Sequence, residues 1–318
     1  FNVGVDLSLF NNRLRMTADY YRKKTTDLLN NVEMPRSSGY TTALRNIGSI
    51  RNSGFELQLD GRIIDRAVKW DLGVNFSLNR SKVLVLSEDK DIFGGELDNT
   101  ILKDQLNLMR VGEPMYVFYG YVEDGYDENG HIVYKNMDDD PAITAADKTI
   151  IGDPNPDFLV NLTTAVSYKG FTLSAFFQSS IGNDIYSLSM AAQAYDYGYN
   201  GNTLREVYYN HWTPENPTAK YPNLDQTSYK MSDRFVYDGS FVRLKNLELA
   251  YDVPCARSKF IKRARVYVSA QNLFTITSYP FWDPDINANG GGSSMIQGVD
   301  SYCYPSARTY TIGCRLTF

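Results

Sequence analysis

Oxygen-bearing side chains recur at alternate positions between residues 136 and 147, a spacing that suits a calcium-binding loop. Ca²⁺ is a hard cation, and the best-known calcium loop supplies oxygen ligands from its positions 1, 3, 5, 7 and 12. The matching residues here are Asn136, Asp138, Asp140, Ala142 (through its backbone carbonyl) and Asp147. The first ligand is a neutral amide, and Pro141 stands where that loop needs glycine for a sharp turn. The segment is a candidate calcium site, with a solvated acidic loop as the alternative.

Aromatic residues crowd two further segments that lack a strand pattern. They are Tyr195, Tyr197, Tyr199, Tyr208, Tyr209, Trp212, Phe281 and Trp282. An aromatic plane can stack on the apolar C–H face of a sugar ring, so these residues are candidates for binding a glycan substrate. The alternatives are that they pack long loops together or form the aromatic girdle of a membrane barrel.

Enzymes and nucleic-acid-binding proteins are disfavoured by the remaining chemistry of the chain. The only histidines, His131 and His211, fall in separate loops, so a histidine-based catalytic triad has little to draw on. The net charge is −5, and basic residues cluster only briefly, at 262–265, which gives no footprint for a phosphate backbone. We therefore expect no catalytic residues and no nucleic-acid partner.

The candidate residues lie between segments in which apolar and polar residues alternate strictly. The alternating segments are 3–9 with 14–20, 55–60 with 70–79, 158–168 with 171–178, 241–251 with 265–274, and finally 309–318. A period of two indicates strands with one apolar and one polar face. The phase breaks near Lys245 and Asn246, which predicts a β-bulge.

The connections between these strands alternate between short and long. Short turns near residues 11, 65, 169 and 256 alternate with excursions over about 25–50, 81–156, 182–238 and 276–305. Loops beyond about 15 residues are uncommon in globular domains, whereas outer-membrane barrels combine short periplasmic turns with long extracellular loops. The pattern predicts an all-β fold, an antiparallel transmembrane β-barrel, in preference to a soluble β-sandwich.

Strand parity limits how many segments can cross the membrane. Residues 115–121 resemble a strand, but counting them as spanning would put the next short turn on the wrong side. We place them in the extracellular excursion 81–156, paired with residues 131–134. About nine spanning strands remain, and because bacterial barrels have even strand numbers, residues 1–318 are expected to be the C-terminal portion of a larger barrel.

Several motifs in this order resemble the C-terminal barrel half of SusC/RagA-type TonB-dependent transporters. They are NIGSIRNSGFELQL (46–59), WDLGVNFSLNRSKVLVL (70–86), TIIGDPNPDF (149–158), SFVRLKNLELAYDVP (240–254) and RVYVSAQNLFTITSYPFWDPD (265–285). The resemblance implies a barrel of about 22 strands with a plugged lumen. It also implies that the plug domain and the N-terminal strands lie outside this chain.

The resemblance carries expectations about partners and location. It implies a Bacteroidetes-type outer membrane, a SusD-like surface lipoprotein and energy from the TonB complex, contacted through a region outside this chain. Phe318, a terminal aromatic after alternating apolar residues, resembles the signal read by the barrel-assembly machinery.

The function that follows is active import of oligosaccharides through a barrel embedded in the lipid bilayer. Import of peptides by the same mechanism is the alternative within the family. A non-transporting outer-membrane barrel, either an enzyme or an adhesin, is the alternative outside it.

Overall fold

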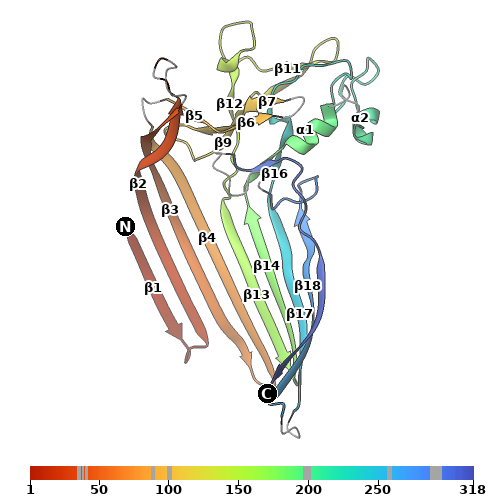
Figure 1. Cartoon of the computed structure of the whole chain (residues 1–318). Coiled ribbons are helices and arrows are strands. Elements are labelled where there is room, and N and C mark those ends of the chain that lie inside the picture. The colour runs from red at the N-terminus through yellow and green to blue at the C-terminus, as the bar shows by residue number, and fades with distance from the viewer. Residues whose placement is uncertain are drawn as a thin grey trace.

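The computed structural model describes residues 1–33, 37, 39, 42–86, 90–98, 102–195, 202–255, 260–286 and 296–318. One large antiparallel sheet dominates it, and shorter strands and helices gather at one end of that sheet (Figure 1). Among the described residues, no helix is long and apolar enough to cross a membrane.

The large sheet has nine strands, each hydrogen-bonded to its neighbours in chain order. They are β1 (Asn2–Leu9), β2 (Leu14–Glu33), β3 (Thr42–Asp65), β4 (Val68–Leu86), β13 (Phe158–Tyr168), β14 (Phe171–Ile181), β17 (Phe241–Val253), β18 (Arg263–Thr277) and β20 (Thr309–Thr317). All eight pairings are antiparallel. The predicted number of strands and the all-β class are confirmed.

The register aligns the apolar residues of all strands on one face of this sheet. Leu162 lies opposite Val74 on one side and Phe177 on the other, while Asn161 lies opposite Asn75 and Gln178. Pairing in this phase separates an apolar face from a polar face across the whole sheet. Large apolar side chains on this face, such as Ile312, which is 85% exposed, are not covered by a protein layer in the part of the chain that the structure describes. A lipid-facing surface has this composition.

The turn at Lys169 and Gly170 shows how a two-residue connection forms the short end of the sheet. Both residues have positive φ, 47° and 84°, which is the backbone of a type I′ hairpin turn. This turn matches the twist of the flanking strands β13 and β14 and fixes their register from Tyr168 opposite Phe171 onwards.

The predicted bulge lies at Lys245. On β14, Phe176 pairs with Asn246 and Phe177 pairs with Leu244, so Lys245 is an extra residue. The ladder between β17 and β18 shifts at the same place. The bulge restores the apolar phase that the sequence pattern loses there.

The predicted irregular excursion over residues 25–50 is wrong. Strands β2 and β3 continue as one ladder as far as Glu33 opposite Thr42. Their pairing shifts twice between Thr25 and Leu29, and Asp27 has a φ of 57°. These irregularities break the alternation on which the expectation depended, although the backbone hydrogen bonding continues.

The long connections fold into a separate layer above the sheet. It contains β5 (Ile92–Phe93), β6 (Glu96–Asp98), β7 (Lys103–Gln105), β8 (Asn107–Met109), β9 (Val117–Gly120), β10 (Glu123–Tyr126), β11 (Ile132–Tyr134), β12 (Thr149–Gly152), β15 (Asp184–Ser187), β16 (Val236–Asp238) and β19 (Val299–Asp300). Two α-helices, α1 (Leu188–Tyr195) and α2 (Arg205–Tyr209), and two short 3₁₀ helices (Ala145–Asp147 and Asp233–Phe235) complete it.

Residues 115–121 contribute β9 to this layer rather than to the large sheet, but their predicted partner is wrong. Strand β9 pairs with β12 and β8, whereas β11 pairs with β10. The link to the predicted partner is through side chains instead: the rings of Tyr121 and Tyr134 pack 5.7 Å apart. Pairing between short strands in long loops is non-local, so local alternation could not specify it.

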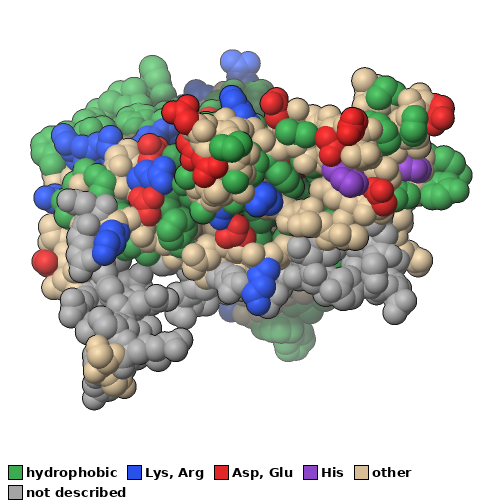
Figure 2. All heavy atoms as spheres, turned by 90° about the horizontal axis from the view of Figure 1, so that it is seen from above, with side chains coloured by type: hydrophobic (Ala, Val, Ile, Leu, Met, Phe, Trp, Pro, Cys, Tyr) green, Lys and Arg blue, Asp and Glu red, His purple; other side chains and the backbone are tan. Residues whose placement is uncertain are grey.

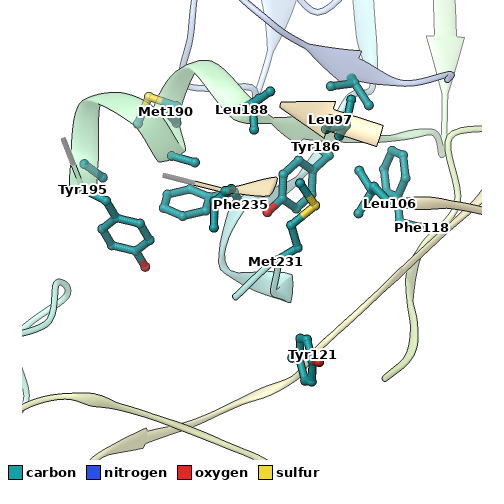
Figure 3. Packing of buried hydrophobic residues seen from close by; sticks show 14 of the residues in the cluster. Leu97, Leu106, Phe118, Tyr121, Tyr186, Leu188, Met190, Tyr195, Met231 and Phe235 are labelled. Carbon is teal, nitrogen blue, oxygen red and sulfur yellow. The ribbon is translucent and has the colours of Figure 1, made fainter. Parts of the chain in front are cut away.

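The main hydrophobic core of the chain lies in this upper layer. Phe118, Tyr186, Met231, Phe235 and Val299 are at most 2% exposed and belong to one cluster. Figure 3 shows that the ring of Phe235 lies between Tyr195 of α1 and Met231. The loops therefore form a packed unit that can hold side chains in fixed positions, as a binding surface requires.

A tyrosine of β18 covers a glycine of the last strand, and this contact gives a first prediction. A Cβ added at Gly313 would overlap Cζ of Tyr267. We expect Gly313→Ala to lower the free energy of unfolding by about 1 kcal/mol, because the phenol end of the Tyr267 side chain must move aside to make room for the new Cβ. Unfolding in urea would measure the loss.

Two further variants separate this contact from a general effect of alanine. A Cβ at Gly61 would meet only Ile63 and Leu14 at ordinary contact distances of 3.5 and 3.6 Å, so Gly61→Ala should cost much less. Combining Gly313→Ala with Tyr267→Ser should recover stability, and no recovery in the double variant would contradict the packing argument.

Candidate substrate-binding surface

Tyr195 lies inside the upper layer and not on a binding surface. Its side chain is 4% exposed, and its ring stacks on Tyr229 with centroids 3.8 Å apart and meets Phe235 edge-on at 5.1 Å. Burial raises the pKa of its phenol well above the usual value. Tyr195 therefore packs the loops together, which was the alternative to binding a glycan.

Tyr208 and Tyr209 are the exposed members of the same predicted cluster. They lie on α2 and are 61% and 65% exposed, with their rings edge to face at 5.2 Å. The buried side chain of Val207 anchors the helix to the core beneath them. Tyr197 and Tyr199 lie outside the described residues.

The remaining aromatic candidates divide in the same way. Trp212 packs against the backbone of Gly130, where an added Cβ would overlap its indole. Phe281 is partly buried against the core, and Trp282 stacks on it with centroids 4.9 Å apart and is 57% exposed. Of the aromatic candidates that the structure describes, Tyr208, Tyr209 and Trp282 therefore present a ring to solvent.

A buried ion pair fixes the segment that carries Phe281 and Trp282. Arg243 of β17 is 2% exposed and its guanidinium contacts the carboxylate of Asp283, which is 7% exposed. Arg243 also donates to Thr275 Oγ1 at 2.9 Å and to Ser306 Oγ at 3.1 Å. Burial acts to raise the pKa of Asp283, but the N–H groups of Ser306 and Asp285 and the guanidinium hold it below its usual range.

A pocket links the two aromatic segments, and no sequence pattern indicated it. Its described lining residues are Met190, Leu204, Arg205, Glu206, Lys220, Tyr237, Pro280 and Phe281. Only Phe281 was a sequence candidate. The others come from α1, the start of α2, the segment before Tyr221, β16 and Pro280 next to Phe281, and only the folded layer brings them together.

The calcium candidate forms a loop that satisfies its own polar groups. The carboxylates of Asp138 and Asp140 accept backbone N–H bonds from Asp140 at 2.8 Å and Ala142 at 3.0 Å, and the Asn136 amide oxygen accepts one from Asp138 at 3.1 Å. Asp147 is buried, and both of its oxygens accept backbone N–H bonds, from Met137 and Thr144 at 2.7 Å each.

The backbone hydrogen bonds to these carboxylates occupy oxygens that a metal ion would need as ligands. The N–H groups of Met137 and Thr144 hold the pKa of Asp147 below its usual range. Among the described residues, no group of three or more acidic, histidine or cysteine side chains is arranged to hold a metal ion. Calcium binding here stays a prediction, to be checked by titrating the full-length protein with Ca²⁺ and following heat release.

Phe318 follows directly after β20 and is 71% exposed. Its recognition by the barrel-assembly machinery stays a prediction.

Figure 2, which looks onto the upper layer, shows acidic and basic side chains interspersed on this face. Mixed charge of this kind suits a surface that binds polar ligands without attracting one sign of charge over long range.

Tyr195 provides a prediction that separates packing from binding. Its hydroxyl is buried and has no hydrogen-bond partner among the described residues. Tyr195→Phe should therefore raise the free energy of unfolding, by about 1 kcal/mol, because an unpaired buried hydroxyl is removed. Tyr195→Ala should lower it by about 3 to 5 kcal/mol through loss of packing. A thermal unfolding scan of both variants measures the difference, and equal losses would contradict it.

The fold and this layer define a class of protein. The sheet is antiparallel and curved, and it has one apolar and one polar face. Short turns close one of its ends, and a folded loop layer covers the other. These are the features of the wall of an outer-membrane β-barrel. Residues 1–273 match the family described as TonB dependent receptor-like, β-barrel. The chain belongs to this family, and membership implies location in the outer membrane.

Individual relatives agree over the whole chain. It is 33% identical to TonB-dependent receptor P3 of Formosa agariphila and 29% identical to TonB-dependent receptor SusC of Bacteroides thetaiotaomicron, in both cases over 100% of this chain. It covers 34% and 31% of these relatives, so it spans about a third of their length. The expected resemblance to SusC/RagA-type receptors, over the C-terminal part of the barrel, is confirmed. These relatives are receptors, not enzymes.

A solved structure shows the same similarity over the whole chain. The chain superposes on the RagAB peptide transporter with a TM-score of 0.82 and 28% sequence identity, covering 100% of this chain and 34% of that one. In the closed-closed state of the RagAB peptide importer the TM-score is 0.83 at the same identity.

Proposed function

We propose that the full-length protein imports oligosaccharides across the outer membrane of a Bacteroidetes-type bacterium, with energy delivered through the TonB complex. A SusD-like lipoprotein on the cell surface is the proposed partner above the loop layer. The observation that supports import is the polar face of the nine-stranded sheet, which is continuous from β1 to β20. Such a face lines the lumen of a barrel.

Oligosaccharide is the favoured cargo because of the exposed aromatic rings on the loop layer. Tyr208 and Tyr209 present two rings at right angles, and Trp282 presents a third. Planar aromatic side chains supply contact area without needing to be ordered on binding. Sugar rings offer C–H faces that match them.

Peptide is the second candidate, and one observation favours it. The solved structures on which the whole chain superposes are named as peptide transporters. Their identity to this chain is 28%, and the choice between peptide and oligosaccharide is left to the uptake experiment.

The experiment is uptake by cells. A strain lacking the full-length gene, complemented with it, should accumulate a labelled oligosaccharide, and deletion of TonB should abolish the accumulation. Accumulation that persists without TonB would overturn active import. Accumulation of labelled peptides alone would select the second candidate, and accumulation of neither, together with normal assembly, would favour a non-transporting barrel.

The exposed rings give a prediction with a matched control. Replacing Tyr208 and Tyr209 together by alanine should weaken oligosaccharide binding by about three- to tenfold, because two stacking contacts are lost. The unfolding transition should not change, because both side chains are exposed. Tyr304 is 89% exposed on another segment, and Tyr304→Ala should leave binding unaltered. Equal effects of the two changes on isothermal titration would argue against a role for α2.

A further inference from the structure

The pocket between α1, α2, β16 and residues 280–281 combines an apolar floor with a charged rim. Met190 is 7% exposed, Leu204 and Tyr237 are partly buried against the core, and Phe281 stacks on Trp282. Arg205, Glu206 and Lys220 surround this floor and are exposed. The volume is about 360 Å³, within the range of small-ligand sites.

Two polar groups on the lining have no hydrogen-bond or ion-pair partner among the residues that the structure describes. The Arg205 guanidinium lies over the ring of Tyr209 at 5.5 Å and has no carboxylate within ion-pair distance among the described residues. The Tyr237 hydroxyl likewise has no hydrogen-bond partner in the described part of the chain, although its ring packs edge-on against Tyr279 at 5.9 Å. Both groups are therefore free to serve a ligand.

The other two charged residues of the rim, Glu206 and Lys220, neutralise each other. Lys220 Nζ lies 2.8 Å from Glu206 Oε1. With this pair formed, Arg205 leaves the pocket with one net positive charge. An ion pair at the edge of an apolar surface also offers both donors and acceptors to neighbouring hydroxyl groups.

We propose that this pocket binds an anionic sugar residue, one that carries a carboxylate or a sulfate. The inference rests on the proposed import of oligosaccharides and narrows the class of cargo. The C–H face of the ring packs on the floor that Phe281 forms, the anionic group pairs with Arg205, and the ring hydroxyls meet Tyr237 and the Glu206 and Lys220 pair. Charge-assisted bonds from a guanidinium to carboxylate or sulfate oxygens are the strongest of these contacts.

The test compares anionic and neutral ligands on the full-length transporter purified with its lipoprotein partner. The probes are short oligogalacturonates, the same oligosaccharides after carboxyl reduction, sulfated carrageenan oligosaccharides and oligoglutamate peptides. Isothermal titration should show tighter binding of at least one anionic glycan than of the neutral counterpart. Arg205→Gln should weaken that binding by about tenfold and leave the neutral ligand unaffected.

Matched variants separate the pocket from general electrostatics. Lys135→Gln removes one positive charge from an exposed position elsewhere on the loop layer and should leave the affinity unchanged. Tyr237→Phe removes only the hydroxyl and should weaken anionic and neutral glycans equally. Folding of each variant is checked by its unfolding transition.

The outcomes are distinct from those of the uptake experiment. Four results would each overturn the anionic-sugar site. Arg205→Gln and Lys135→Gln could weaken binding equally, or the neutral glycan could bind more tightly than the anionic one. Oligoglutamate alone could bind, or no anionic glycan could bind at all. Import that still requires TonB in the Arg205→Gln strain would then leave the proposed function standing. Import without TonB would overturn the function itself, whatever the pocket binds.

Discussion

Replacing Asp283 by alanine is expected to lower the free energy of unfolding by about 3 to 5 kcal/mol, because it removes the buried counter-charge of the Arg243 guanidinium and leaves only the partly exposed Asp285 beside it. Arg243 is 2% exposed and joins β17 to the segment that carries Phe281 and Trp282. Loss of the pair should also loosen that segment. Unfolding in guanidinium chloride measures the first effect, and hydrogen exchange at residues 279–286 measures the second.

The control is a neighbour that shares the same arginine. Asp285 lies 3.4 Å from Arg243 Nη1 but is 41% exposed, so Asp285→Asn should cost less than about 1 kcal/mol. Replacing both partners of the buried pair, with Arg243→Met and Asp283→Leu, should recover much of the loss. A double variant as unstable as Asp283→Ala would show that the charge pair is not the cause.

The same pair predicts a dependence on acid. The folded-state pKa of Asp283 lies below its unfolded value of about 3.9. The ionised Asp283 carboxylate therefore stabilises the folded state fully above about pH 4, and this stabilisation is lost as the pH falls through the folded-state pKa. The stability difference between the wild type and Asp283→Ala should shrink in that direction.

Ile312→Arg is expected to impair assembly by about 2 to 4 kcal/mol, the cost of a cation on the lipid face near the bilayer midplane. Ile312 lies in the middle of β20, opposite Val268 on the apolar face, and is 85% exposed within the chain. The measured quantity is the folded fraction recovered from outer membranes, resolved by its heat-modifiable mobility on a gel.

The adjacent residue is the control because it lies on the opposite face. Thr311 pairs with Ser269 on the polar face, and Thr311→Arg should be tolerated. Leu316 is on the apolar face but near the end of β20, so Leu316→Arg should cost less than Ile312→Arg. Equal damage from arginine at 311 and 312 would contradict the assignment of the faces.

The sequence by itself determined the large sheet. Alternation places Leu162 on one face and Asn161 on the other regardless of the rest of the fold, because a strand has a period of two. The break at Lys245 marked the bulge for the same local reason. The order of the motifs also identified the family that residues 1–273 match.

Two expectations failed for different physical reasons. The ladder of β2 and β3 continues through shifted pairs near Leu28, so loss of alternation did not mean loss of strand. The partner of β9 depends on how several long loops close over one another. Backbone hydrogen bonds between distant segments leave no fixed spacing in a sequence.

The binding surface was decided by the tertiary structure. Tyr195 and Tyr208 are the same residue type in one aromatic-rich segment, yet one is 4% exposed and the other 61%. Which ring faces solvent depends on the core formed with Phe235 and Tyr229, contributed by another part of the chain. Arg205 and Phe281, which are far apart in the sequence, line one pocket because the folded loop layer brings their segments together. Alternation along a strand is set by the backbone of each residue, whereas exposure and convergence are set by what packs against it.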